Sequence, residues 1–266
     1  MPSQSGPTGV SGMLSPGASP PSAPSLVFPW HAGNDPGFLL EREWLVTNGL
    51  GGYASGTLLG VATRRYHGLF IPNLPAPRGR TLMLPRLDEE VQVGARVVRL
   101  GGAEFADGRI TGEWHRALRE FRYEWRTPIW LFAIDEHLLQ KRITMPYSQN
   151  TVCIEYRVLA GGPIRLNLRP FVSLRSPDGP LGCPTEWPFT LTITKGRYEV
   201  HPFEGAPALK LCLRRRPGVF IADQCMSGQV FYRDERRRGY DHLEDLFSPG
   251  YFTVELPPGE AVALMA

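Results

Sequence analysis

The chain has 266 residues, of which 42% are hydrophobic and 21% charged, with a formal net charge of +3. This small charge gives no reason to expect a nucleic-acid partner, and no stretch reaches the ~18 consecutive apolar residues of a membrane span. Glycine and proline are abundant, with 29 and 26 residues, which predicts many turns and excludes a helical bundle. The composition also excludes a collagen, a coiled coil and a wholly disordered chain.

The cysteines and the N-terminus carry no strong signal. Cys153, Cys183, Cys212 and Cys225 form no C-x-x-C pair, and no pair of histidines completes a zinc-binding pattern. We therefore expect reduced thiols, no metal ion and no cofactor. The N-terminus lacks the basic and apolar segments of a signal peptide, so a cytoplasmic location is the default expectation.

The first 25 residues are mainly Ser, Pro and Gly. Such a segment cannot bury enough apolar surface to fold, so we expect a disordered tail over residues 1–25 and a single domain over residues 26–266. Beyond the tail, alternation of apolar and polar residues predicts strands. In chain order these are residues 66–71, 80–84, 87–93, 96–100, 121–126, 128–134, 137–145, 151–158, 164–169, 189–194, 197–201, 208–214, 218–222, 228–232, 251–256 and 261–265.

The alternation is clearest in residues 151–158 and 164–169, and Ala160-Gly161-Gly162-Pro163 between them predicts a hairpin. Short strands separated by Gly and Pro turns predict an all-β fold, a large antiparallel sandwich or barrel. Helix is expected only in short pieces, in residues 113–118 and 235–246.

A glycine cluster, Gly49-Leu50-Gly51-Gly52, begins like a dinucleotide-binding loop. The third glycine is misplaced, however, and the next segment predicts a strand rather than a helix, which argues against that function. The sequence also contains no P-loop, no H-E-x-x-H and no G-x-S-x-G motif.

Carboxylates cluster at residues 88–90, at residues 135–136, and at Asp241, Glu244 and Asp245. A glycosidase needs two carboxyl groups about 5–10 Å apart, a distance that the sequence does not supply. The third cluster belongs to residues 233–245, which also hold several arginines and His242. Two interpretations stay open for it: an exposed helix with ion pairs, or a polar surface for a sugar or a neighbouring domain.

A second polar cluster, Arg64-Arg65-Tyr66-His67, enters a predicted strand. On a pleated strand Arg65 and His67 share one face, and Arg64 and Tyr66 share the other. Guanidinium groups and a phenol offer the hydrogen bonds and the flat apolar face that sugars need. The alternative is that both arginines form ion pairs that hold the adjacent glycine loop.

Tryptophan rings can also serve as platforms for sugars, although most tryptophans in proteins pack in cores or interfaces. The candidates are Trp30, Trp44, Trp114, Trp125, Trp130 and Trp187. We expect at most one or two of them to be platforms.

Two long blocks carry a family resemblance: Trp44-Leu45-Val46-Thr47-Asn48-Gly49 and Arg64-Arg65-Tyr66-His67-Gly68-Leu69. Residues 80–84, 141–145, 168–172 and 244–250 agree with it. From about residue 38 to its end, the sequence resembles the N-terminal domain of bacterial and archaeal glycogen debranching enzymes of the amylo-α-1,6-glucosidase type.

The resemblance implies a large antiparallel supersandwich of the mutarotase-like kind, followed by a catalytic (α/α)6 toroid whose carboxylates cleave the α-1,6 branch. The sequence ends at Met265-Ala266, directly after the last predicted strand. We therefore expect the hydrolytic acid and base to lie outside it, and we assign no catalytic residue. The implied partners are an α-glucan and a catalytic toroid, in cis or in trans.

Three hypotheses follow. The chain is a substrate-shaping accessory domain of a debranching enzyme; or a self-sufficient 4-α-glucanotransferase or mutarotase-like enzyme that uses His67 or His137; or a purely structural module. The candidate residues for substrate binding or a domain interface are Trp44, Asn48, Gly51, Gly52, Tyr53, Arg64, Arg65, Tyr66, His67, Asp241, Glu244 and Asp245.

Overall fold

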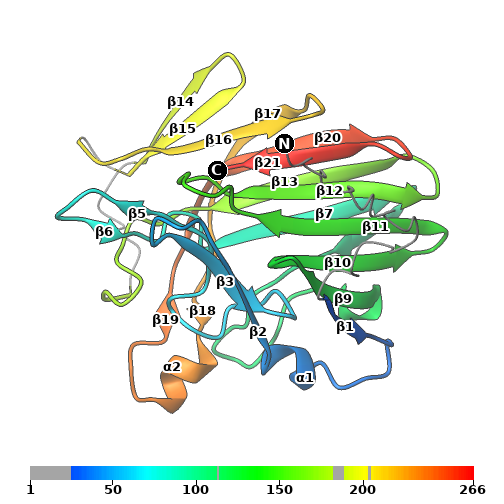
Figure 1. Ribbon diagram of the computed structural model, residues 1–266, viewed down its shortest axis with the longest axis horizontal. Coiled ribbons are helices and arrows are strands. Elements are labelled where there is room, and N and C mark those ends of the chain that lie inside the picture. The colour runs from blue at the N-terminus through cyan, green and yellow to red at the C-terminus, as the bar shows by residue number, and fades with distance from the viewer. Residues whose placement is uncertain (1–24, 113, 182–188, 203–204) are drawn as a thin grey trace, which may run out of the picture.

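The computed structural model describes residues 25–112, 114–181, 189–202 and 205–266, which form mainly antiparallel strands (Figure 1). The expected tail lies outside the described residues except for Ser25, and so do Cys183 and Trp187. The first strand begins at Ser25, one residue before the expected start of the domain. Within the described residues, no helix is long and apolar enough to cross a membrane.

The larger sheet has nine strands. In spatial order they are β1 (Ser25–Pro29), β9 (Leu118–Glu124), β10 (Thr127–Ile134), β11 (His137–Thr144), β12 (Cys153–Ala160), β21 (Ala261–Met265), β16 (Leu209–Arg214), β15 (Arg197–His201) and β14 (Thr190–Thr194). The C-terminal strand β21 lies between β12 and β16, because Met265 pairs with both Cys153 and Cys212. The last residues of the chain are therefore central to this sheet.

The second sheet has five strands. In spatial order they are β17 (Val219–Met226), β20 (Phe247–Leu256), β13 (Ile164–Phe171), β7 (Arg86–Val93) and β8 (Arg96–Arg99). The predicted alternation in residues 164–169 is confirmed. Ile164, Leu166 and Leu168 are buried, whereas the residues between them are polar and more exposed.

Smaller elements surround the two large sheets. A three-stranded sheet holds β2 (Glu43–Thr47), β3 (Tyr53–Thr57) and β4 (Gly68–Ile71); two ribbons hold β5 (Asn73–Leu74) with β6 (Gly79–Arg80), and β18 (Val230–Phe231) with β19 (Leu243–Glu244). The helices are α1 (Gly37–Leu40), α2 (Arg233–Arg237) and a 3-10 turn at Trp114–Arg116.

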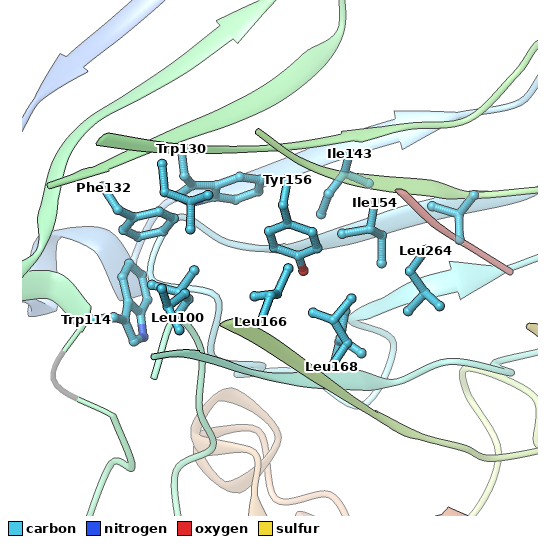
Figure 2. Close-up of a cluster of buried hydrophobic side chains, with 14 of the residues drawn as sticks. Leu100, Trp114, Trp130, Phe132, Ile143, Ile154, Tyr156, Leu166, Leu168 and Leu264 are labelled. Carbon is cyan, nitrogen blue, oxygen red and sulfur yellow. The ribbon is translucent and has the colours of Figure 1, made fainter. Parts of the chain in front are cut away.

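The main core lies between the two large sheets. Figure 2 shows Trp130, Phe132 and Tyr156 from the nine-stranded sheet facing Leu166 and Leu168 from the five-stranded sheet. Burial of each such side chain contributes on the order of 1.5–3 kcal/mol. Two sheets with one apolar face each therefore stabilise one another, and the predicted all-β sandwich is confirmed.

The prediction of a hairpin across Ala160-Gly161-Gly162-Pro163 is wrong. Strand β12 pairs with β11 and β21 in one sheet, whereas β13 pairs with β20 and β7 in the other. The connection crosses from one sheet to the other, with φ of +94° at Gly161. Both strands have one apolar face, and in this arrangement those faces pack against each other across the core.

The two predicted helices are shorter than expected. Only Trp114–Arg116 is helical within the described part of residues 113–118. Helix α2 covers Arg233–Arg237 and ends before Gly239, which has φ of +77°. The expected helix over residues 235–246 is therefore wrong beyond its first turn, although the ion pairs Arg237–Asp234 and Arg238–Glu235 do form there.

Candidate functional site

The glycine cluster forms the loop that joins β2 to β3, where Thr47 pairs with Tyr53. Gly49 and Gly51 have φ of +79° and +88°, in the left-handed region that favours glycine. A Cβ on Gly49 would also lie 2.4 Å from the ring of Tyr147. The backbone of this loop thus requires glycine at both positions.

Asn48 organises this loop from within. Its side chain is completely buried, and its Oδ1 accepts hydrogen bonds from Leu50 N at 2.9 Å and Gly52 N at 3.0 Å. Its Nδ2 donates to Gln149 O and to Asn150 Oδ1, both at 2.9 Å. One amide therefore joins the glycine loop to the connection between β11 and β12.

Two more side chains hold the loop through its carbonyl oxygens. Asn73 Nδ2 donates to Leu50 O at 2.9 Å, and Arg80 Nε donates to Gly51 O at 2.8 Å. Sequence reasoning missed Asn73, Arg80, Gln149 and Asn150 as parts of the site. Their contacts are with backbone groups or with a distant amide, and such contacts leave no pattern in the sequence.

A hollow of about 610 Å³ opens beside the loop. It is lined by Glu43, Trp44, Leu45, Thr47, Gly49, Gly51, Gly52, Tyr53, Ser55, Tyr66 and Arg80. A second hollow of about 440 Å³ shares Tyr53, Tyr66 and Arg80, and adds Arg78, Ser176, Pro177 and Asp178. We call the two together the loop groove; its size suits a small polar ligand or part of a longer one.

Two tyrosines form the centre of the loop groove. Tyr53 Oη donates to Tyr66 O at 3.0 Å, and burial raises the pKa of Tyr53 to about 12. Burial also raises the pKa of Tyr66, whose ring meets His67 edge to face with 5.6 Å between the ring centroids. Both phenols are therefore protonated at neutral pH and present apolar ring surface beside polar tips.

Glu43 stands at one end of the groove and binds two motif residues. Its Oε1 lies 2.6 Å from Arg64 Nε and 3.4 Å from His67 Nε2. The neighbouring His67 and Arg64 outweigh partial burial and lower the pKa of Glu43 to about 2. This carboxylate is thus ionised over the physiological range and anchors the polar cluster to β2.

The expected pleated-strand arrangement of Arg64 to His67 is wrong, because the strand begins only at Gly68. The chain turns instead: His67 N donates to Arg64 O, and Thr63 N donates to His67 Nδ1. Arg65 and His67 consequently have different partners: Arg65 Nε lies 3.8 Å from Glu235 and its guanidinium 5.1 Å from the Tyr240 ring centroid, whereas His67 meets Glu43. Both arginines form ion pairs, as the alternative interpretation predicted, but their partners Glu43, Asp234 and Glu235 lie outside the glycine loop.

Of the predicted acidic residues, Glu244 connects to the motif but does not line the groove. Its buried carboxylate accepts two hydrogen bonds from Arg175, at 2.6 and 2.9 Å, and one from Tyr232 Oη. Arg175 also donates to Arg65 O at 2.7 Å. Asp241 is exposed and Asp245 half-buried, and neither lines the loop groove.

Most of the tryptophan and histidine candidates are buried. Trp30, Trp44, Trp114 and Trp130 are buried, whereas Trp125 is 69% exposed in the turn between β9 and β10. His67 and His137 are also buried, and His137 Nε2 accepts a hydrogen bond from Gly162 N. Cys153, Cys212 and Cys225 are free and only half-buried.

The comparisons with known proteins decide the family. The family described as glycogen debranching enzyme N terminal matches residues 42–263. The chain belongs to this family. None of the curated proteins compared with it matches.

One similar solved structure is a bacterial glucoamylase in complex with acarbose. It is 10% identical to this chain, with a TM-score of 0.36, and the alignment covers 92% of this chain. The chain spans only about a third, 34%, of the length of that glucoamylase.

Membership of the glycogen debranching enzyme N-terminal family supports a role in glucan processing. The matched region contains the described part of the loop groove, from Glu43 to Asp178, together with the Arg175–Glu244 ion pair. Trp44, Gly51, Gly52, Tyr53 and Tyr66 are the predicted residues that the structure brings together in the groove.

The charge of Glu43 should make the stability of this glycogen debranching enzyme N-terminal domain depend on pH. We expect Glu43→Gln to lower the free energy of unfolding by about 1 kcal/mol or less near neutral pH, as for other partly exposed ion pairs. The pKa is lowered from 4.5 to about 2, so the stabilisation is complete above pH 4.5 and is lost as the pH falls towards 2.

Urea unfolding at about pH 7 and about pH 3 measures this dependence. The difference between wild type and variant should shrink at the lower pH. Asp107→Asn, which removes a charge from an exposed pair with Arg109, is the matched control. A Glu43→Gln effect that is the same at both pH values would contradict the expectation.

Proposed function

We propose that this chain is the substrate-shaping N-terminal domain of a glycogen debranching enzyme, and that it binds a segment of α-glucan in the loop groove. Family membership supports the context, and the loop groove is the observation that carries the proposal. Hydrolysis is then the task of a catalytic toroid in cis or in trans, and no residue of this chain is assigned to it.

The chemistry of the groove fits a sugar chain. The Tyr53 and Tyr66 rings offer apolar surface for the C–H faces of sugar rings, and Arg80 offers several donors. Glu43 and Asp178 add acceptors, one in each of the two adjoining hollows. The hydrogen bonds of Asn48, Asn73 and Arg80 fix the loop before a ligand binds, which reduces the entropy lost on binding.

The rim of the groove suits the toroid as a neighbour. Leu45 lines the groove and is 52% exposed, Leu50 lies in the glycine loop and is 43% exposed, and Tyr147 packs against Gly49 and is 81% exposed. Exposed apolar side chains that gather beside a polar site are typical of a protein interface. In this proposal the glucan lies between the groove and the docked toroid.

The test is binding of a linear α-glucan, maltoheptaose, to the purified chain by titration calorimetry. Tyr66→Ala removes one ring of the groove, and we expect at least a tenfold rise in Kd, about 1.4 kcal/mol. Tyr240→Ala is the matched control, because Tyr240 is 46% exposed and lines neither hollow of the groove. Equal affinity of Tyr66→Ala and wild type, with both folded, would refute the loop groove as the glucan site.

A further inference from the structure

The outer face of the five-stranded sheet carries a second groove. Two hollows of about 520 and 530 Å³ adjoin there and share Asn167 and Tyr251. Strands β7, β13, β20 and β17 supply most of the lining, and no residue is common to this groove and the loop groove. We call it the sheet groove.

The register of the strands explains its course. Glu90, Asn167, Thr253 and Val219 oppose one another on four neighbouring strands. This row crosses three strand spacings, roughly 14 Å. The groove therefore runs across the strands over a length that accommodates a few sugar rings rather than a single small molecule.

The charges of the sheet groove balance. Each of the five arginines in its lining pairs with a carboxylate. The pairs are Arg86–Asp88, Arg99–Glu90, Arg165–Glu255, Arg169–Asp223 and Arg216–Glu260. Glu89 also borders the hollow, but its buried carboxylate faces the core and pairs with Lys141. A groove rich in donors and acceptors but without net charge matches a neutral polyhydroxylated ligand, and does not match an anion or a cation.

The sheet groove also offers apolar surface. The Arg169 guanidinium carbon lies 4.9 Å from the centroid of the Tyr251 ring. Beside Tyr251, the side chains of Val219 and Ile221 are 64% and 37% exposed. An aromatic ring and exposed aliphatic side chains suit the apolar C–H faces of sugar rings.

We propose that the sheet groove is a second binding site for a neutral α-glucan chain, centred on Tyr251 and Asn167. The identity of the ligand rests on the proposed function, whereas the position of the site rests on the sheet groove alone. Two grooves on one domain bind two segments of a branched polymer at once. Such a domain binds the polymer more tightly than it would through either groove alone.

The experiment compares variants of the whole chain by calorimetry with maltoheptaose and by retardation in native gels that contain glycogen. We expect two sites on the wild type. Tyr251→Ala and Asn167→Ala should each weaken one site at least tenfold, and Tyr66→Ala should weaken the other. Tyr251→Ala together with Tyr66→Ala should abolish gel retardation, whereas the control Tyr240→Ala should retain it.

Each result decides one site. If Tyr66→Ala weakens binding but both Tyr251→Ala and Asn167→Ala bind like wild type, the sheet groove is refuted and the loop groove stands. If only the sheet-groove variants weaken binding, the loop groove is refuted. Wild type that binds neither maltoheptaose nor glycogen refutes both. Asn167→Ala removes only an outward-facing amide from a strand, so its result remains informative if Tyr251→Ala fails to fold.

Discussion

Replacing Lys141 by methionine is expected to lower the free energy of unfolding by about 3–5 kcal/mol at neutral pH, the usual cost of leaving a buried charge without its partner. Lys141 Nζ lies 2.6 Å from one oxygen of Glu89 and 2.9 Å from the other. The Glu89 side chain is fully buried, and Tyr156 Oη donates to the same carboxylate. Methionine keeps the length of the side chain, so the effect reports the lost charge rather than a cavity.

The cost should increase with pH. Burial raises the pKa of Glu89, and the nearby Lys141 counteracts part of that rise. Without Lys141 the pKa of Glu89 rises further, so the folded variant holds a proton that the unfolded chain releases. Its stability is therefore greatest below the unfolded pKa of Glu89 and decreases as the pH rises through the folded pKa.

Urea unfolding at about pH 5 and about pH 8 tests this, with the larger loss expected at the higher pH. Lys141→Met combined with Glu89→Gln removes both charges and should recover much of the loss, since a neutral buried pair needs no counter-charge. A loss that is equal at both pH values, or a double variant no more stable than Lys141→Met, would show that the ion pair is not the cause.

Local patterns predicted most strands of the two large sheets, because alternation records which face of a strand meets the core, but they missed β1, β2 and β3. Val152, Ile154, Tyr156 and Val158 are all buried, as expected from the alternation in residues 151–158. Pairing could not be predicted in the same way. A Gly-Gly-Pro turn permits the next strand to pair with its predecessor or to cross the sandwich, and the choice depends on distant strands such as β21 and β20.

The candidate site was predicted only in part, because local patterns do not show which distant segments approach one another. The motif residues Trp44, Tyr53 and Tyr66 do meet in one groove, because β2 and β3 form a hairpin and the turn before β4 returns to it. The residues that hold this groove, such as Asn150 and Arg80, come from segments whose approach only the folded chain shows. The prediction that Arg65 and His67 share one face of a strand was wrong, because a turn precedes the strand that begins at Gly68.

The organising role of Asn48 leads to a second large effect. We expect Asn48→Ala to lower the free energy of unfolding by roughly 2–4 kcal/mol, since four hydrogen bonds of a buried amide are lost and their partners stay unsatisfied. The loss also frees the glycine loop, because Leu50 N and Gly52 N no longer have a common acceptor. Binding to the loop groove should therefore weaken in the variant even under conditions in which the domain remains folded.

Urea unfolding and maltoheptaose titration on the same samples separate the two consequences. Asn73→Ala is the matched control, because this exposed asparagine donates one hydrogen bond to the same loop and should cost about 1 kcal/mol or less. If Asn48→Ala were destabilised no more than Asn73→Ala, the buried amide would not be the organising contact of the loop. If Asn48→Ala were destabilised as expected but bound maltoheptaose like wild type, the loop would not position the glucan. A binding site built from this backbone cannot keep its geometry once Leu50 N and Gly52 N have lost their common acceptor.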